Sequence, residues 1–226
     1  MANFRKIGVL TSGGDAPGMN AAIRAVVRSA LARGVEVVGI YKGYTGLISG
    51  EIKDISSAEV ANISGIGGTI LYSDRCPEFK TEEGMAKAVK TCRDNHIDGI
   101  VAIGGDGTFR GATDMSVRGI PTIGLPGTID NDITSTDYSI GFDTAMNTVV
   151  TAADRLRDTC ESHARCEVVE VMGRDAGYIA LQCGLAVGAT AVAVKELPFD
   201  ADACIEKLKE LRAGGQRSFL VMVSEG

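Results

Sequence analysis

The chain has 226 residues, 45% of them hydrophobic, and a formal net charge of −6 at pH 7. This composition is ordinary for a soluble globular protein, and the acidic balance argues against nucleic acid or membranes as partners, because both favour basic surfaces. No hydrophobic run approaches a membrane span, and the six separate cysteines with only two histidines favour free thiols over a zinc site. We therefore expect a cytoplasmic protein.

Strands and helices are predicted to alternate along the first part of the chain. A hydrophobic strand at 6–11 is followed by a helix at 20–33 and a strand at 35–41. The segment 42–74 is rich in glycine and weakly periodic, so no element is assigned there. A helix at 82–95, a strand at 99–103 that continues into 104–108, a short helix and a buried strand at 120–125 follow. Strands joined by helices predict a parallel sheet.

The pattern changes after residue 141, which predicts two domains, 1–141 and 142–226. The second domain is expected to contain helices at 142–158, 178–187 and 200–212 and strands at 166–172, 190–194 and 218–223. The predicted fold class is α/β, with two three-layer domains, mainly parallel sheets and an active site in the cleft between them. The sequence stops directly after a strand, which suggests that the second sheet is unfinished.

Three glycine-rich turns, 12–18, 104–108 and 126–132, follow predicted strands, and each carries aspartate. Glycine lets the main chain approach a ligand, and successive N–H groups in such turns form a cradle for anions. Aspartate would repel phosphate unless a divalent cation lies between them, so the set predicts a polyphosphate with a cation. The Walker A, dinucleotide-binding and hydrolase-elbow patterns are absent from the sequence, which leaves phosphoryl transfer.

Phosphoryl transfer needs a base for the acceptor hydroxyl, a cation and basic groups around the migrating phosphoryl. Asp130 is the candidate base, Asp106 the carboxylate beside the metal, and Arg75 and Arg174 the basic groups. The alternative is structural: aspartate and asparagine favour turns, and arginines in loops are usually solvated.

Five segments resemble ATP-dependent 6-phosphofructokinase of the bacterial type. They are 11–20 (Thr-Ser-Gly-Gly-Asp-Ala-Pro-Gly-Met-Asn), 104–108 (Gly-Gly-Asp-Gly-Thr), 126–132 (Pro-Gly-Thr-Ile-Asp-Asn-Asp), 141–145 (Gly-Phe-Asp-Thr-Ala) and 171–177 (Val-Met-Gly-Arg-Asp-Ala-Gly). They occur in the family's order over nearly the whole chain. The resemblance implies transfer of the γ-phosphoryl group of ATP to O1 of fructose 6-phosphate in glycolysis, with Mg²⁺, by a homotetramer.

The resemblance also implies site residues. Those with catalytic roles are Gly14, Thr128, Asp130, Asp132 and Arg174, with Asp130 as the base for the O1 proton. Those that bind ATP are Gly14, Arg75, Cys76, Gly105, Asp106, Gly107 and Thr108, with Asp106 on the magnesium ion. Those that bind fructose 6-phosphate are Thr128, Ile129, Asp130, Arg165, Met172, Gly173, Arg174 and Glu225, with Arg165 reaching a neighbouring subunit. Those implied for an ADP or phosphoenolpyruvate effector between subunits are Arg24, Arg28, Arg157 and Gly188.

Two positions indicate the phosphoryl donor. Pyrophosphate-dependent relatives carry aspartate where this chain has Gly107 and lysine where it has Gly127. An aspartate side chain at 107 would crowd and repel the α-phosphate of a nucleotide, so the two glycines favour ATP.

The family's chains continue past Gly226, so the resemblance implies that the C-terminal part of the second domain is not in this sequence.

Two other functions stay open from the sequence. A lipid or NAD kinase also carries Gly-Gly-Asp-Gly-Thr after a strand, although 126–132 and 172–177 argue against it. A non-catalytic nucleotide-binding subunit would keep 104–108 but would gain nothing from Asp130.

Overall fold

The computed structural model describes residues 4–226, which form two compact units. The first unit comprises the chain up to Thr128 together with Ser139–Gly141, and the second comprises Ile129–Tyr138 with Phe142–Gly226. The loop Ile129–Tyr138, which the expected boundary at 141 places in the first domain, thus groups with the second unit. Each unit is described by itself.

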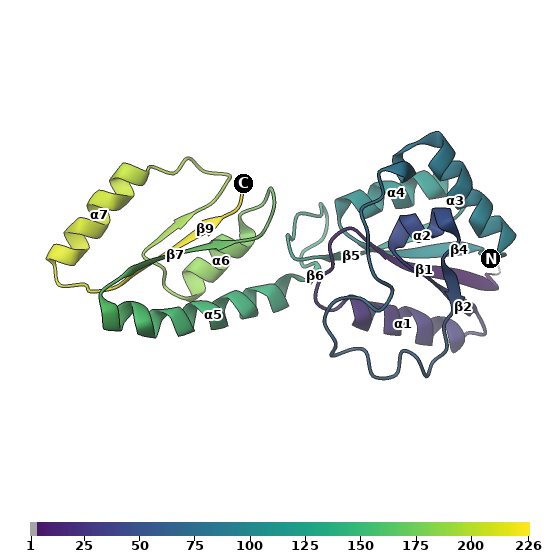
Figure 1. The fold of residues 1–226 in the computed structure, drawn as a ribbon, viewed down its shortest axis with the longest axis horizontal. Coiled ribbons are helices and arrows are strands. Elements are labelled where there is room, and N and C mark those ends of the chain that lie inside the picture. The colour runs from purple at the N-terminus through teal and green to yellow at the C-terminus, as the bar shows by residue number, and fades with distance from the viewer. Residues whose placement is uncertain (1–3) are drawn as a thin grey trace. The chain divides into compact units, whose positions relative to one another are not determined.

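The first unit is built on a sheet with the strand order β3-β2-β1-β4-β5-β6. All neighbouring pairs are parallel except β2 and β3 (Figure 1). The strands are β1 Lys6–Ser12, β2 Glu36–Ile40, β3 Ile52–Asp54, β4 Gly99–Gly104, β5 Thr122–Thr128 and β6 Ile140–Gly141. The prediction of a mainly parallel sheet is confirmed.

Helices cover both faces of this sheet, which makes the unit three-layered (Figure 1). The helix α1 (Met19–Leu31) lies on one face, and α2 (Gly43–Ser49), α3 (Glu82–Asp94) and α4 (Asp106–Val117) lie on the other. A short 3₁₀ turn, η1 (Glu78–Lys80), precedes α3. The main core lies between the sheet and the second group of helices; among its buried residues are Leu10, Val38, Tyr44, Leu47, Phe79, Met85, Ile100 and Met115.

The structure corrects two expectations for this unit and assigns elements to one segment that the sequence left unassigned. The residues Asp106–Thr108 form the first turn of α4 rather than a continuation of β4, because Gly105 takes the position before the helix. The strand β5 runs on to Thr128, and its Ile123 is 65% exposed, so this strand is not buried on both faces. The unassigned segment 42–74 contains α2 and β3, which are only seven and three residues long and so show little periodicity.

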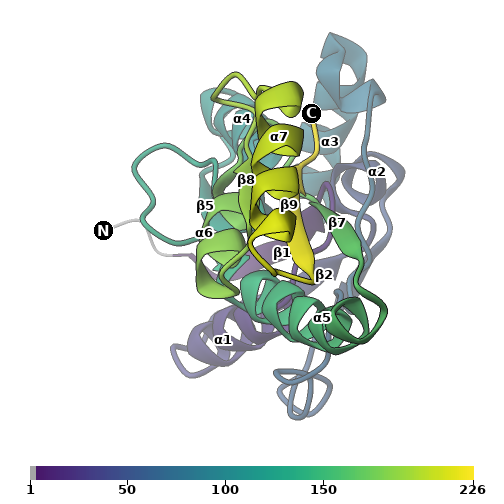
Figure 2. The ribbon, with the colours of Figure 1, turned by 90° about the vertical axis from the view of Figure 1, so that its left-hand side faces the viewer.

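The second unit has a parallel three-stranded sheet with the order β7-β9-β8. Its strands are β7 Cys166–Val171, β8 Ala191–Ala193 and β9 Phe219–Ser224, and its helices are α5 Phe142–His163, α6 Tyr178–Ala186 and α7 Ala201–Ala213. The core packs α5 and α6 on the sheet through residues such as Phe142, Val171, Ile179 and Met222. Figures 1 and 2 show α7 on a different side of this sheet from α5, and α7 has no fully buried residue. The helix α5 extends past the expected end at 158, because buried Cys160 continues the face of buried Ala153.

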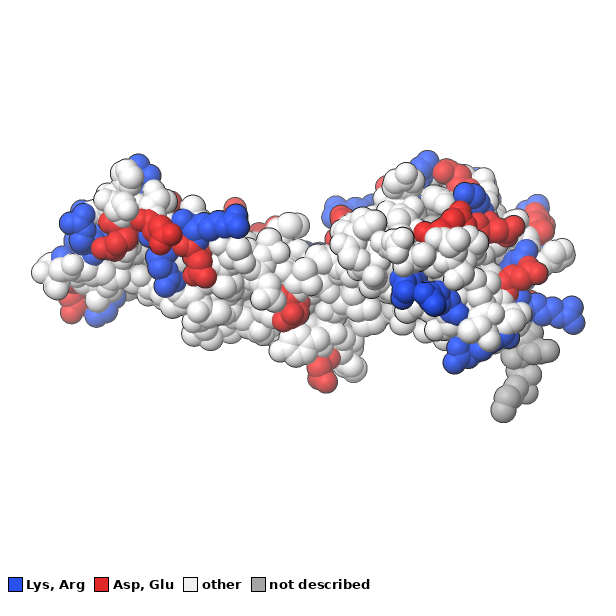
Figure 3. All heavy atoms as spheres, turned by 90° about the horizontal axis from the view of Figure 1, so that it is seen from below, with Lys and Arg blue, Asp and Glu red and all other residues white. Residues whose placement is uncertain are grey.

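The surface charge is mixed. On the face shown in Figure 3, small groups of basic side chains alternate with acidic ones. Within residues 4–226, no helix combines the length and hydrophobicity that a membrane span requires.

Candidate active site

The ends of β1, β4 and β5 lie side by side in the first unit, and their loops therefore share one edge of the sheet. Ser12 at the end of β1 is in register with Gly104 at the end of β4, and Gly104 is in register with Pro126 of β5. The hydroxyl of Thr108 donates a buried hydrogen bond of 3.0 Å to the main-chain oxygen of Ser12, which ties the first two glycine turns together. This edge is where α/β sheets bind ligands.

The segment that carries Arg75 and Cys76 is fastened to the same edge. Thr11 Oγ1 donates to the carbonyl oxygen of Tyr72 at 2.8 Å, and the N–H of Gly13 donates to the carbonyl oxygen of Asp74 at 3.2 Å. Arg75 is exposed and Cys76 is half-buried. Hydrogen bonds therefore hold Gly14, Arg75 and Cys76, all expected to bind the nucleotide, in neighbouring loops at this edge.

Three glycines at this edge are not required by the fold itself. A Cβ added to Gly14 or Gly107 would have no atom within 4 Å, and one added to Gly105 would make only ordinary contact with Thr128, at 3.6 Å. None of the three has a positive φ. Free space beside glycine is what a ligand that approaches the main chain needs. The start of α4 adds N–H groups that no side chain of its N-cap residue, Gly105, can bind.

Asp106 is the carboxylate expected beside the metal ion. Its side chain is 47% exposed, lies in the first turn of α4, and makes a salt bridge of 2.9 Å with Arg110 Nη2. No group of three or more potential metal ligands occurs among residues 4–226. One carboxylate still suits Mg²⁺, which keeps several waters and is bound by one or two carboxylates plus substrate phosphates. The residues therefore fit an ion that arrives with a polyphosphate rather than one held by the protein alone.

The loop with the two candidate catalytic aspartates begins where β5 ends. Its base is closed in the first unit by β6, which pairs with Gly127 and Thr128, and by Ser139, whose hydroxyl donates a 2.7 Å hydrogen bond to the carbonyl oxygen of Thr128. Asp130 and Asp132 are both half-buried and flank Asn131, which has a left-handed φ of 54°. A left-handed φ is uncommon outside glycine, and asparagine is among the residues that adopt it most readily.

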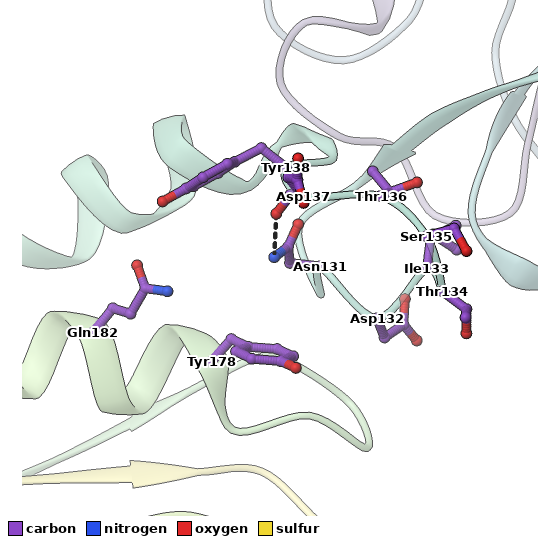
Figure 4. Close-up of a pocket in the computed structure, with 10 residues that line it drawn as sticks. All are labelled: Asn131, Asp132, Ile133, Thr134, Ser135, Thr136, Asp137, Tyr138, Tyr178 and Gln182. Atoms are coloured by element: carbon purple, nitrogen blue, oxygen red, sulfur yellow. Dashed lines mark hydrogen bonds between the residues drawn. The ribbon is translucent and has the colours of Figure 1, made fainter.

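A hollow of about 460 Å³ lies in the second unit beside this loop. Figure 4 shows Asp132 on one side of it and Tyr178 and Gln182 of α6 on another, while Asn131 Nδ2 donates to the carbonyl oxygen of Asp137 at 3.2 Å. Ile129 points instead toward the apolar core of this unit and is partly buried against it. Of the predicted sugar-phosphate residues on the loop, Ile129 thus has a packing role.

The turn at 172–177 is held by acidic side chains of the second unit. Glu225 Oε1 accepts hydrogen bonds from the N–H groups of Gly173 and Arg174, at 3.1 and 2.6 Å. Glu196 Oε1 accepts from the N–H of Gly177 at 2.8 Å, and Lys195 forms an ion pair with Asp175. That pair lowers the pKa of the Asp175 carboxyl below its usual value.

These contacts leave the Arg174 side chain exposed, with Nε 3.7 Å from Asp175. Met172 is exposed as well. Glu225, expected to contact the sugar phosphate, fixes the backbone of the turn in this structure. Arg165 is exposed in the connection between α5 and β7.

The predicted effector residues are divided between the units. Arg24 and Arg28 lie one turn apart on α1, and Arg24 Nε donates to the carbonyl oxygen of Ala61 at 3.2 Å. Arg157 on α5 and Gly188 after α6 belong to the second unit. The Nε donor of Arg24 is thus already used in a hydrogen bond within the first unit.

Three residues that support the site were not predicted from the sequence. Tyr44 bonds to Thr108, Ser139 to Thr128 and Glu196 to Gly177. Each bonds to the main chain of a glycine-rich or polar segment of the site, and no motif or periodicity marks them.

Known proteins are similar to this chain in sequence and in fold. The model of the family described as phosphofructokinase matches residues 6–226. A protein of Halalkalibacterium halodurans named ATP-dependent 6-phosphofructokinase is 54% identical over 223 residues, which cover 99% of this chain and 70% of that protein. A protein of the same name from Listeria welshimeri is 53% identical over 223 residues, which again cover 99% of this chain and 70% of that protein. The structure of phosphofructokinase from Saccharomyces cerevisiae is similar with a TM-score of 0.90 at 35% identity, over 98% of this chain and 34% of that one.

Proposed function

Because the chain belongs to the phosphofructokinase family, we propose that it is an ATP-dependent 6-phosphofructokinase that converts fructose 6-phosphate and ATP into fructose 1,6-bisphosphate and ADP. The observation that carries the nucleotide part is the set of glycines that the fold does not require, Gly14, Gly105 and Gly107, gathered at one sheet edge beside Arg75. The relatives named above cover the chain almost completely and are kinases by name.

On the donor side, main-chain N–H groups at the start of α4 hold the phosphates of ATP, and Arg75 neutralises their charge. Asp106 would bind Mg²⁺, which neutralises phosphate charge when bound. Gly107 leaves room for the α-phosphate, and this favours ATP over pyrophosphate as the donor. Cys76, half-buried next to Arg75, and Thr108 complete the nucleotide contacts.

On the acceptor side, Asp130 accepts the proton of the O1 hydroxyl as O1 bonds to the γ-phosphorus and the bond to the β–γ bridging oxygen breaks. Thr128 and Asp132 orient the sugar and the loop, while Arg174 and Arg165 bind phosphate oxygens. Met172 and Gly173 line the sugar site, and Glu225 keeps their turn in place.

Regulation and assembly follow the same proposal. A homotetramer in the cytoplasm would place Arg24 and Arg28 of one subunit near Arg157 and Gly188 of another. Two arginines one helical turn apart repel each other by a few tenths of a kcal/mol, and an anion such as ADP or phosphoenolpyruvate would relieve that repulsion.

The test is a fructose 1,6-bisphosphate formation assay with ATP or pyrophosphate as donor, on the wild type and on Asp130→Ser. We expect turnover with ATP and a fall in kcat of about 10²–10⁴-fold in the variant, the usual range for loss of a general base. Asp154→Ser, an exposed carboxylate change on α5, is the control and should keep wild-type kcat. Turnover with pyrophosphate alone would overturn the donor assignment. ATP binding without any turnover would instead support the non-catalytic nucleotide-binding subunit.

A further inference from the structure

Asn20 lies in the first turn of α1, and the proposed function gives its side chain no task. This polar residue is only 1% exposed. Its Nδ2 donates to the carbonyl oxygens of Ile66 and Gly67, at 2.9 and 3.3 Å, and its Oδ1 accepts from the N–H of Ile70 at 2.8 Å. One buried amide therefore bridges both ends of a turn in a distant loop.

The turn that Asn20 bridges, residues 66–70, has few contacts of its own. Gly67 and Gly68 form its middle, and a Cβ added to Gly67 would meet no atom within 4 Å. Ile66 is 54% exposed, so its side chain does not anchor the turn in the core. Because glycine leaves the main chain free to take many conformations, we infer that the three hydrogen bonds to Asn20 select one of them.

The same turn contains Thr69, which meets β1. Thr69 Oγ1 lies 2.9 Å from the Oγ1 of Thr11, a fully buried residue. The Thr11 hydroxyl already donates to the carbonyl oxygen of Tyr72, so Thr69 is the donor between the two threonines. Thr69 Oγ1 also accepts from the N–H of Leu71 at 3.3 Å. The turn held by Asn20 thus continues into a connected network of hydrogen bonds beneath β1.

Arg75 follows directly after this network. The carbonyl oxygen of Asp74 accepts from the N–H of Gly13 at 3.2 Å, and Asp74 Oδ1 accepts from the N–H of Arg75 itself at 2.7 Å. The main chain at Arg75 is therefore held, while its side chain is exposed. A guanidinium group binds phosphate through a rigid fork of N–H donors, so a displaced main chain would weaken those hydrogen bonds.

We propose that Asn20 is a positioning residue for the phosphoryl donor, acting through the turn 66–70 to hold Arg75 at the phosphates of ATP. The inference rests on the proposed function, and it assigns Asn20 no contact with ATP. If the Asn20 amide served stability alone, its loss would change ATP affinity equally whether or not the Arg75 side chain is present. The two roles therefore separate when the same change is made with and without that side chain.

The experiment is a double-mutant cycle of Asn20→Asp and Arg75→Ala. Aspartate is as large as asparagine and keeps the acceptor for Ile70, but its carboxylate repels the two carbonyl oxygens that the amide bonds. Calorimetry gives the dissociation constant of ATP for the wild type, both single variants and the double variant. We expect Asn20→Asp to weaken ATP binding about tenfold when Arg75 is present, the effect of losing a hydrogen bond to a charged group, and less than about twofold beside Arg75→Ala.

Asn95→Asp is the matched control. Asn95 Nδ2 also donates to a carbonyl oxygen, that of Thr91 at 2.9 Å, but Asn95 is exposed at the end of α3. The Asn95→Asp protein should therefore bind ATP as the wild type does. Melting temperatures of all the variants are measured alongside, because they report the contribution of each side chain to stability.

Equal losses of ATP affinity with and without the Arg75 side chain, or no loss in Asn20→Asp, overturn the proposal whatever the melting temperatures. If Asn20→Asp does not fold, Asn20→Ser takes its place in the cycle, because its shorter side chain removes the bridge without adding a charge. The same two expectations apply to it. Failure of the wild type to bind ATP, or wild-type affinity in Arg75→Ala, would contradict the proposed function instead, so the two failures are distinguishable.

Discussion

The hydroxyl of Ser139 donates a hydrogen bond of 2.7 Å to the main-chain oxygen of Thr128, eleven residues earlier in the chain. Ser139 is 4% exposed, and Thr128 is the last residue of β5, directly before the loop with Asp130. Together with the pairing of β5 and β6, this bond closes the base of that loop. A side chain without catalytic chemistry thus fixes where the proposed base begins.

We expect Ser139→Ala to lower kcat about tenfold, because loss of a buried hydrogen bond costs about 1–2 kcal/mol and misplaces the loop. Steady-state kinetics with ATP and fructose 6-phosphate measure this change in kcat. Ser162→Ala on α5 removes a similar hydroxyl-to-carbonyl bond, to Asp158 at 2.9 Å, from an exposed site and should leave kcat unchanged. Equal kcat in the two variants would show that the bond has no part in positioning the loop.

Gly107→Asp tests the assignment of the phosphoryl donor. A Cβ at this position meets no atom within 4 Å, and an acidic residue in the first turn of a helix is favourable, so the variant should melt at or above the wild-type temperature. Its carboxylate would repel the α-phosphate, and we expect the KM for ATP to rise at least about tenfold. The KM for ATP and the melting temperature are both measured for the variant and for the wild type.

Gly65→Asp is the matched control for that change. Gly65 also has open space where a Cβ would lie and no positive φ, and it belongs to a loop outside the nucleotide site. The Gly65→Asp protein should keep wild-type kinetics despite the same change in charge. A Gly107→Asp protein that uses ATP as well as this control would contradict the placement of the nucleotide beside Gly107.

The sequence predicted most of this fold because its longer elements are periodic. The helices α1, α3 and α5 and the core strands lie within a few residues of their expected places. The elements that were missed, α2, β3, η1 and β6, have seven, three, three and two residues. Such short segments are stabilised by contacts with the rest of the unit, such as the approach of Gly46 to the carbonyl of Tyr41, and not by their own pattern.

The same distinction applies to the candidate site. Parallel strands end at one sheet edge, so the gathering of the glycine turns there could be predicted from strand order. The residues that support these turns could not be predicted. Tyr44 is 64 residues from Thr108 and Glu196 is 19 residues from Gly177, and both bond to main-chain atoms that any residue would offer. Motifs identify residues that meet a ligand, while the residues that hold those motifs in place emerge from tertiary structure.

Cys76 provides a chemical probe of the nucleotide site. It is half-buried beside Arg75, whereas Cys166 is exposed in the second unit, and burial raises the pKa of the Cys92 thiol to about 12. We expect ATP to slow the alkylation of Cys76 by iodoacetamide several-fold, to leave the rate at Cys166 unchanged, and Cys92 to stay unmodified in the native protein. Peptide mass spectrometry after timed quenching gives each rate. Equal rates at Cys76 with and without ATP would remove this cysteine from the nucleotide contacts.

Asp98 links the stability of the first unit to pH. Its Oδ2 accepts hydrogen bonds from the N–H groups of Arg5 and Lys6, at 2.6 and 3.0 Å, at the start of β1. These two bonds hold the pKa of the carboxyl below its usual value. A carboxyl with a lowered pKa in the folded state adds stability above its unfolded pKa of about 4, and this contribution is lost as the pH falls from there toward the folded value.

We expect Asp98→Asn, which keeps an oxygen acceptor but cannot be protonated in this range, to show a smaller fall in the urea midpoint than wild type between pH 5 and pH 3. Hydrogen exchange gives a local measurement, because the Arg5 and Lys6 amides lose a charged acceptor only in the wild type when Asp98 takes up its proton. Protection at these two amides, corrected for the intrinsic rate, should therefore fall with acid in the wild type and stay nearly constant in the variant. Parallel pH curves for the two proteins would mean that Asp98 protonation does not control the start of β1.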